Sequence, residues 1–251
     1  MKNVLQKQII WIYITVFINI LSFGMILPLL PLFAESFGAT PFEIGLLVAL
    51  FSVGQFFAAP IWGRLSDRFG RKPILLASIL TTVAAYGLMG ITKSLAYLFV
   101  GRFLHGVSSA GNYPIAVAYI ADKTAKEERT RYISRISAVF ARAFMIGPLF
   151  GGILGEESFS YAFLAAALVA AANFFLVLAF LPESLTERRE HKILAEGLFN
   201  LRAIWHGLRS DFGVLFFLLF AWSFYVSNFQ LAIPLFTQER FGAGAFENAL
   251  F

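Results

Sequence analysis

The stretch GRLSDRFGRKP, residues 63–73, decides how this chain folds. It combines two glycines, Gly63 and Gly70, with five charged side chains, which are Arg64, Asp67, Arg68, Arg71 and Lys72. The runs on either side, 44–62 and 74–92, contain no charged residue at all. A Lys or Arg at the centre of a bilayer costs about 2.5–3.5 kcal/mol on insertion scales. Charge gathered between two such runs therefore predicts a turn in water that joins two membrane-spanning helices.

The composition of the whole chain also indicates a membrane protein. Of its 251 residues, 59% are hydrophobic and only 14% are charged, whereas a soluble domain has about 25% charged residues. The chain has no cysteine, which excludes disulfides and thiolate metal sites. Its net charge of +5 comes from basic residues in short loops between apolar runs, a pattern that argues against nucleic acid as a partner.

Seven apolar runs are long enough to cross a bilayer, which takes about 20 residues. They cover 9–33, 44–62, 74–92, 96–120, 132–154, 160–181 and 212–236. We expect helices, because backbone polar groups in lipid need partners within the same segment and the alternation of a barrel strand is missing. Lys and Arg are concentrated at the N-terminus and in every second loop. This asymmetry predicts a multi-pass protein of the cell membrane with a cytoplasmic N-terminus and a retained first span.

An internal repeat links the first and seventh runs. The first ends in PLFAESFGATPFE (31–43) and the seventh in PLFTQERFGAGAFE (234–247). Because six spans separate them, the copies face the same side of the membrane, as in a parallel repeat of six-helix transporter units. We therefore expect a six-helix N-terminal bundle at 1–181, and a cytoplasmic connection at 182–211 that is either an amphipathic surface helix or a partly ordered linker. Residues 212–251 would begin a truncated C-terminal bundle in a chain of about twelve spans.

Four motifs identify a family that this chain resembles, the major facilitator superfamily, in its drug and tetracycline efflux branch. GRLSDRFGRKP is similar to the motif between helices two and three, and GRFLHGVSSAG (101–111) to the helix-four motif at Arg102 and Gly106. LPES (181–184) is similar to the usual end of helix six. IGPLFGGILG (146–155) is similar to the helix-five antiporter motif, matching at Gly147, Pro148, Gly151 and Gly152. The resemblance implies an all-α fold of twelve helices in two halves.

The resemblance also gives the opening motif an expected role. It implies that Asp67 lies by the N-terminal end of a helix in the other half, where its charge meets the positive end of the dipole, and that Arg71 pairs with Asp122. Gly63 and Gly70 permit close helix approach and a tight turn. Such contacts would latch the two halves in one state of a gating motif made of Gly63, Asp67, Arg68, Gly70, Arg71, Lys72 and Asp122. The alternative is a topology signal and nothing more.

Polar side chains inside the apolar runs are the candidates for substrate binding or coupling. Helical spacing places Asn19 and Phe23 on one face of the first run, and Arg102, His105 and Asn112 on one face of the fourth. Arg142 lies opposite the glycines of the fifth run, whose glycine face should pack against a neighbouring helix. Ionisable residues within a membrane mark substrate or proton pathways by default. We expect the six to line a central cavity between the two halves or to serve coupling: Asn19, Phe23, Arg102, His105, Asn112 and Arg142.

Three of these residues keep a second interpretation. Arg102 and His105 could serve structural hydrogen bonding alone, and Arg142 could snorkel to the inner surface. The tetracycline/proton antiporters that the chain resembles carry an aspartate where it has Asn19, and no Asp or Glu lies deep in any of the seven runs. Coupling then uses His105, or a carboxylate in the missing half, or no proton at all. Arginines without an acid favour anionic or polar substrates.

The function expected from the sequence is secondary transport of a small molecule by alternating access, as efflux by proton antiport. The alternatives are a carrier of organic anions without proton coupling and an inactive truncated fragment. A retinal protein would need a lysine in 212–236, which has none. An enzyme is not expected, because no metal cluster or Ser/His/Asp set stands out, and neither a cofactor nor a metal is expected. The partners would be the substrate, the lipid bilayer, the missing C-terminal half and, under antiport, protons.

Overall fold

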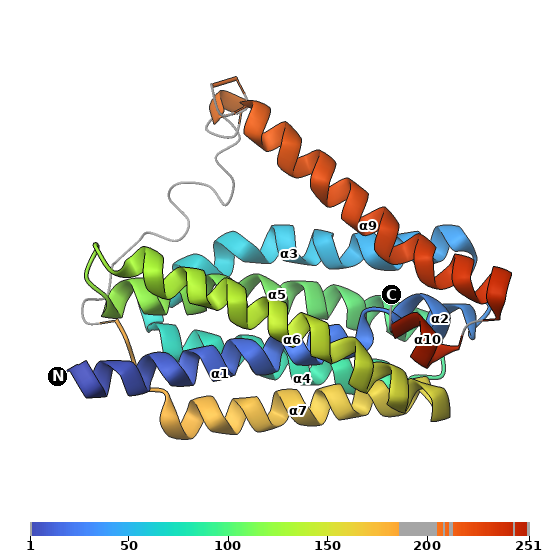
Figure 1. Cartoon of the computed structure of the whole chain (residues 1–251), viewed down its shortest axis with the longest axis horizontal. Coiled ribbons are helices and arrows are strands. Elements are labelled where there is room, and N and C mark those ends of the chain that lie inside the picture. The colour runs from blue at the N-terminus through green and yellow to red at the C-terminus, as the bar shows by residue number, and fades with distance from the viewer. Residues whose placement is uncertain (1, 186–204, 208, 211–212, 243, 250–251) are drawn as a thin grey trace.

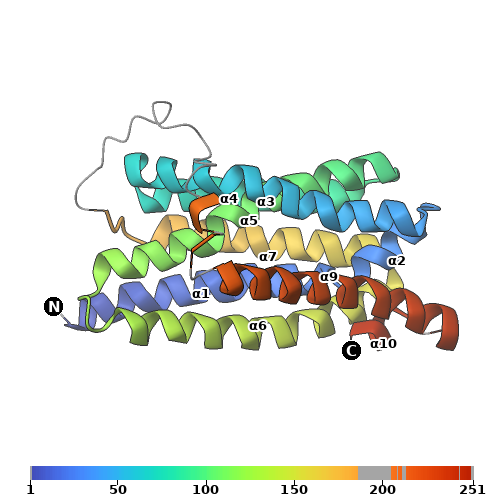
Figure 2. The same cartoon turned by 90° about the horizontal axis from the view of Figure 1, so that it is seen from above.

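The computed structural model describes all residues except 1, 186–204, 208, 211–212, 243 and 250–251, and the described part is helical without strands. Apart from α9, the long helices run roughly along one common axis (Figure 1), and successive helices run in opposite directions (Figure 2). We call the end of the bundle that holds residues 63–73 the motif end. The helices are α1 (Lys2–Ile26), α2 (Leu29–Glu35), α3 (Pro41–Phe69), α4 (Arg71–Ile91), α5 (Leu95–Lys123), α6 (Arg129–Glu157), α7 (Phe159–Phe180), α9 (Gly213–Phe241) and α10 (Ala245–Ala249).

Six helical segments of the described chain are long and apolar enough to cross a membrane. They are Gln8–Glu35, Pro41–Phe69, Arg71–Ile91, Arg129–Glu157, Phe159–Phe180 and Gly213–Phe241. The fourth predicted span corresponds to α5, which is not among the six. Helix α5 has 29 residues, as many as α3, and lies within the bundle. Its stripe of Arg102, His105 and Asn112 lowers its hydropathy, so its place in the bundle comes from packing rather than from apolar composition.

The first predicted span is broken into two helices. Helix α1 ends at Ile26 and α2 begins at Leu29, with a turn at Leu27 and Pro28 between them. Pro28 and Pro31 have no N–H to donate, and a proline ring clashes with the carbonyl four residues earlier. The continuous helix expected over 9–33 is thus wrong at this point, although the two pieces together still form one spanning segment.

Glycines allow two pairs of helices to cross at backbone distance. A Cβ added to Gly147 would lie 2.8 Å from the carbonyl oxygen of Leu21, and one added to Gly151 would overlap the carbonyl oxygen of Met25. The glycine face of α6 therefore packs against α1, as expected; Gly152 is also buried. Gly106 of α5 has the same relation to Phe51 of α3.

The two glycines of the opening motif differ. Gly70 joins α3 to α4 with φ +111°, a backbone conformation that residues other than glycine rarely adopt. Gly63 is exposed within α3, and a Cβ added there would meet no atom within 4 Å. Among the described residues, no helix therefore approaches α3 closely at Gly63, and the close approach expected there stays a prediction.

The apolar interior forms two main clusters along the bundle. Toward the motif end, Val16 of α1 and Ile79 of α4 belong to one cluster. Toward the other end, Met25 of α1 and Tyr86 of α4 belong to a second. The stretch of each helix between its two cluster residues carries polar side chains, so the packing itself leaves room for a polar site midway.

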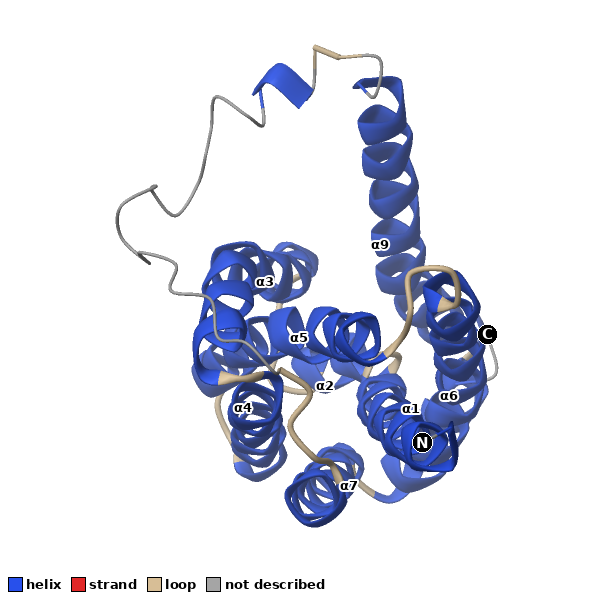
Figure 3. Cartoon of the chain, turned by 90° about the vertical axis from the view of Figure 1, so that its left-hand side faces the viewer, coloured by secondary structure: helices blue, strands red, loops and turns tan. Residues whose placement is uncertain are grey.

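Helix α9 meets the bundle at the end opposite the motif and inclines away from it toward the motif end (Figures 1 and 3). Ala245 of the following α10 packs with Leu29 of α2 and Ala162 of α7. Thr237 of α9 and Asn248 of α10 share a hydrogen bond. The described chain is thus a six-span bundle with a seventh span attached at one end. The predicted surface helix of the 182–211 connection lies largely outside the described residues.

Candidate functional site

A cavity of about 340 Å³ lies midway along the bundle, between the two apolar clusters. Four of the predicted site residues line it, namely Asn19, Phe23, His105 and Asn112. The other residues of its wall come from five helices and include no Asp, Glu, Lys or Arg: Val16, Ile20, Phe51, Gln55, Thr82, Tyr86, Ser109, Tyr113, Pro114 and Phe140. The arrangement can hold a ligand by ring contacts and neutral hydrogen bonds.

His105 is held on both ring nitrogens. Its Nε2 lies 2.9 Å from Tyr86 Oη, and its Nδ1 lies 3.1 Å from a terminal nitrogen of Arg102. Because a guanidinium can only donate, Nδ1 accepts, and the ring proton is on Nε2 and directed at Tyr86. The ring also packs against Phe51, with the centroids 5.0 Å apart. His105 is therefore positioned as a fixed, neutral hydrogen-bonding group of the wall.

Arg102 does not line the cavity. It lies behind His105 and is 2% exposed, with its guanidinium carbon 4.4 Å from the centroid of the Phe51 ring. Within the described residues its Nε has no hydrogen-bond partner, and no carboxylate forms an ion pair with it. Arg102 is thus not part of this wall, and its contacts are those of a cation that donates to His105 and stacks on an aromatic ring.

The two asparagines of the wall differ in what they can still bind. Asn112 accepts from Ser78 Oγ at 2.5 Å and donates to Thr82 Oγ1 at 3.3 Å, which ties α5 to α4. Asn19 is 8% exposed, and its Oδ1 has no partner among the described residues. Asn19 is consequently the wall residue with a buried acceptor available to a ligand.

Arg142 lies on the exposed face of α6, away from the wall. The same face carries Met145, Leu149 and Ile153, which are 73%, 40% and 52% exposed. The opposite face holds the glycines that pack against α1. Arg142 therefore lies on the side of α6 opposite the glycines, as the sequence predicted, and it does not line the midway cavity. Its expected place in a central cavity between the two halves stays a prediction.

The gating motif forms an ion-pair network at its end of the bundle. Arg71 donates from Nε to Asp122 Oδ2 at 3.0 Å and pairs with Asp67 at 2.7 Å. A third bond, of 2.6 Å, joins it to Ser66 Oγ. The expected pair of Arg71 with Asp122 is present, and Arg71 is the centre of the network. Arg68 instead lies over the ring of Phe69, at 5.2 Å.

The chain that follows α7 joins this network. Lys72 Nζ donates to the carbonyl of Leu178 at 2.8 Å. Glu183 accepts from two backbone N–H groups at the start of α4, and Ser184 Oγ donates to Asp122 at 3.2 Å. The sequence singled out LPES only for its resemblance to a helix end, and gave no role to Glu183.

Several wall residues were missed by the sequence analysis. Gln55 interrupts the uncharged run 44–62, and Thr82 and Tyr86 lie one turn apart in 74–92. These polar interruptions were signals that could have added α3 and α4 to the predicted wall. Phe51 and Phe140 had no such signal, because phenylalanine is common throughout the chain.

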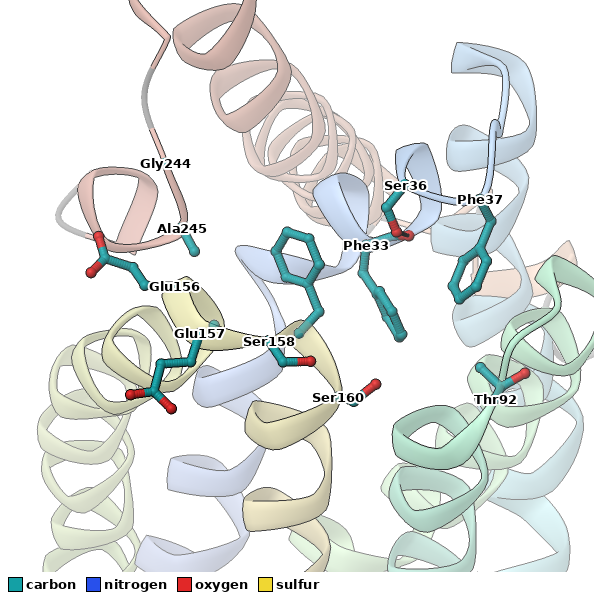
Figure 4. A pocket seen from close by; sticks show the side chains of 12 residues that line it. Phe33, Ser36, Phe37, Thr92, Glu156, Glu157, Ser158, Ser160, Gly244 and Ala245 are labelled. Atoms are coloured by element: carbon teal, nitrogen blue, oxygen red, sulfur yellow. Dashed lines mark hydrogen bonds between the residues drawn. The ribbon is translucent and has the colours of Figure 1, made fainter.

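A larger cavity of about 750 Å³ opens at the end opposite the motif (Figure 4). Phe33, Thr92 and Ser160 belong to its wall, and Glu156 and Glu157 lie on one side of it. It shares no lining residue with the midway cavity. Within the described residues, no group of three or more His, Asp or Glu side chains could hold a metal ion.

Comparison with known proteins gives the family. Residues 12–251 match the model of the Major Facilitator Superfamily. The chain belongs to this superfamily. Its members are transporters, not enzymes, so the family and the all-α fold expected from the four motifs are confirmed. The chain is a multi-pass membrane protein.

Similar proteins include two drug-resistance proteins. The chain is 38% identical over 176 residues to the tetracycline resistance protein, class C, of Escherichia coli, covering 68% of this chain and 43% of that protein. It is 27% identical over 246 residues to multidrug resistance protein 2 of Bacillus subtilis (strain 168), covering 96% and 61%. The chain thus spans about half the length of the curated relatives that it matches.

Solved structures agree on the fold. The human organic anion transporter MFSD10 (TETRAN) superposes with a TM-score of 0.75 at 24% identity, covering 98% of this chain and 68% of that one. A bacterial homologue of the human lysosomal transporter Spinster, in an inward-facing and unoccupied conformation, gives 0.75 at 17% identity, covering 100% and 59%. At these identities the likeness shows the fold alone.

Proposed function

We propose that the transporter to which this chain belongs exports a small molecule by alternating access, driven by proton antiport. The midway cavity carries this proposal: several helices of one bundle enclose a wall that has hydrogen-bonding groups and aromatic rings at the depth where such transporters bind substrate. The named activities of the relatives, tetracycline and multidrug resistance, favour export. The Lys and Arg distribution favours a cytoplasmic motif end and N-terminus.

The wall favours an uncharged or amphipathic aromatic substrate. Phe23 and Phe51 offer rings, and Asn19 offers an unpartnered buried acceptor. The reasoning that favoured anions relied on Arg102 and Arg142 in the wall, and neither lines it. Anion transport without proton coupling therefore has no support from the wall of this cavity.

Antiport requires a group that gains and loses a proton during the cycle. His105 is the only histidine in the wall, but a second ring proton would have to displace Arg102 from Nδ1. The described spans bring no carboxylate into the cavity. We therefore propose that the proton is carried by a carboxylate outside the described residues, with His105 as a fixed part of the wall.

The test is uptake of tetracycline by inverted membrane vesicles that contain the full-length transporter. An imposed proton gradient should drive uptake, and a protonophore should abolish it. Asn19→Ala should raise KM about fivefold to tenfold, the loss of one buried hydrogen bond. The matched control Leu168→Ala removes a side chain that is 72% exposed and should leave KM unchanged. If the protonophore did not change uptake, proton antiport would be refuted. If KM were unchanged in Asn19→Ala, the cavity would be refuted as the binding site.

A further inference from the structure

The first backbone N–H groups of α4 have no partner within the helix, and no side chain next to them in the sequence caps them. The residue before it is Gly70, which has no side chain to offer, and the first N–H groups of any helix lack an intrahelical partner. Glu183, more than a hundred residues later, supplies the acceptors. Its Oε1 lies 2.9 Å from the N–H of Arg71, and its Oε2 lies 3.1 Å from the N–H of Lys72. The next residue is Pro73, which has no N–H, so one carboxylate satisfies the first three positions of the helix.

Gly70 and Glu183 fit together as a pair. A Cβ added to Gly70 would overlap Oε2 of Glu183 and lie 2.9 Å from its carboxyl carbon. Glycine at residue 70 therefore has two effects. It allows the backbone conformation of the turn, and it leaves space for the carboxylate of Glu183. Within the described residues, Glu183 forms no ion pair with a Lys or Arg side chain. Its hydrogen-bond donors among these residues are backbone N–H groups, including those of Ser184 and Leu185 at 2.8 and 3.0 Å.

Two more bonds fasten the same segment to α5. Tyr119 Oη donates to the carbonyl of Pro182 at 2.9 Å, and Ser184 Oγ donates to Asp122 Oδ2 at 3.2 Å. Asp122 Oδ2 is also the acceptor for Arg71 Nε. The segment 182–184 thus touches both partners of the central ion pair, the backbone of Arg71 through Glu183 and the carboxylate of Asp122 through Ser184.

We propose that Glu183 is a positioning residue for the Arg71–Asp122 ion pair. It fixes the first turn of α4 so that the Arg71 guanidinium reaches Asp67, Asp122 and Ser66 together. It acts through backbone hydrogen bonds, and among the residues that the structure describes its charge forms no ion pair. In consequence the α3–α4 turn, the end of α5 and the chain after α7 move as one unit when the transporter changes state. This inference rests on the proposed transport function for its kinetic readout only.

The decisive comparison is Glu183→Gln against Glu183→Ala in the full-length transporter. The Gln amide oxygen keeps an acceptor for the α4 N–H groups, so Glu183→Gln should retain at least half of the maximal uptake rate. Glu183→Ala should lower that rate about tenfold with KM within twofold, because the substrate cavity is not touched. Glu127→Ala is the matched control, since Glu127 is an exposed carboxylate on the loop after α5 at the same end. Equal damage from Gln and Ala would overturn the proposal, as would full activity in Glu183→Ala.

A second variant and a second measurement guard against misfolding and against failure of the transport assay. Gly70→Ala keeps Glu183 but removes its space and also strains the backbone at φ +111°, so it should be at least as damaging as Glu183→Ala. Adding Glu183→Ala to it should cause less further loss than Glu183→Ala causes in the wild type. Amide hydrogen exchange of a peptide covering residues 70–76 should become at least tenfold faster in Glu183→Ala and rise less in Glu183→Gln, which keeps one of the two acceptor oxygens. If wild type transported no probe, that exchange difference alone would decide on Glu183, independently of the proposed function. Unchanged exchange in Glu183→Ala would overturn it.

Discussion

Gly106→Ala should destabilise the bundle by making α3 and α5 separate. A Cβ on Gly106 would overlap the carbonyl oxygen of Phe51 and lie 2.8 and 2.9 Å from its carbonyl carbon and Cα. All three are backbone atoms, so no side-chain rotation relieves the contact, and α3 must move by about 1 Å or more. Overpacking of a filled interior costs about 1–3 kcal/mol. The rigid partner here places Gly106 at the upper end, near 3 kcal/mol.

A matched variant separates this contact from the general effect of alanine. Gly45 lies in the same helical pair, on α3, and a Cβ there would meet no atom within 4 Å. Gly45→Ala should be neutral or stabilise by up to about 1 kcal/mol, because alanine favours a helix more than glycine does. Thermal unfolding in detergent, followed by the loss of monodisperse protein, should therefore melt Gly106→Ala well below wild type and Gly45→Ala at or above it. Equal melting temperatures for the two variants would refute the close crossing.

Three further changes test the site. Tyr86→Phe removes the partner of His105 Nε2 and leaves a buried N–H unsatisfied, so it should cost about 1–3 kcal/mol of unfolding free energy; Tyr161→Phe, at a side chain 54% exposed, should cost almost nothing in the same thermal assay. Arg71→Lys keeps the charge but loses the forked contacts to its two acids, and uptake should fall about tenfold while the amount inserted in the membrane, read by immunoblot, stays normal. Arg142→Gln should leave KM for tetracycline unchanged, and a KM rise above threefold would place that arginine in the wall.

Much of the fold follows from the residues because lipid makes strong demands. Charged residues are excluded from the spans, so the charged stretch 63–73 could be predicted as a turn. The long uncharged runs could be predicted as helices for the same reason. The exceptions have local causes. Pro28 divides the first span because it has no N–H to donate. The hydropathy of the run does not reveal this, so the sequence predicted one continuous helix. The polar stripe of α5 makes that helix a poor candidate by composition, and only its neighbours explain its place in the bundle.

The sequence predicted those site residues that form a polar stripe on a single helix. Asn19, His105 and Asn112 stand out because they interrupt apolar runs at helical spacing. Periodicity tells which residues share a face but not which neighbour covers it, so it could not show that Arg102 and Arg142 lie outside the wall of the midway cavity. Glu183 could not be found in this way, because its partners on α4 are backbone groups more than a hundred positions away, which leave no pattern of side chains in the sequence.

The division of the apolar interior into two clusters has a consequence for leakage. Along α1 the order is Val16, Asn19, Met25, and along α4 it is Ile79, Thr82, Tyr86. On each helix a residue of one apolar cluster is followed by a polar residue of the cavity wall and then by a residue of the other cluster. Each cluster is a packed apolar layer on one side of the midway cavity. Under the proposed alternating access, loosening one layer to admit substrate would leave the other in place as a barrier to ions.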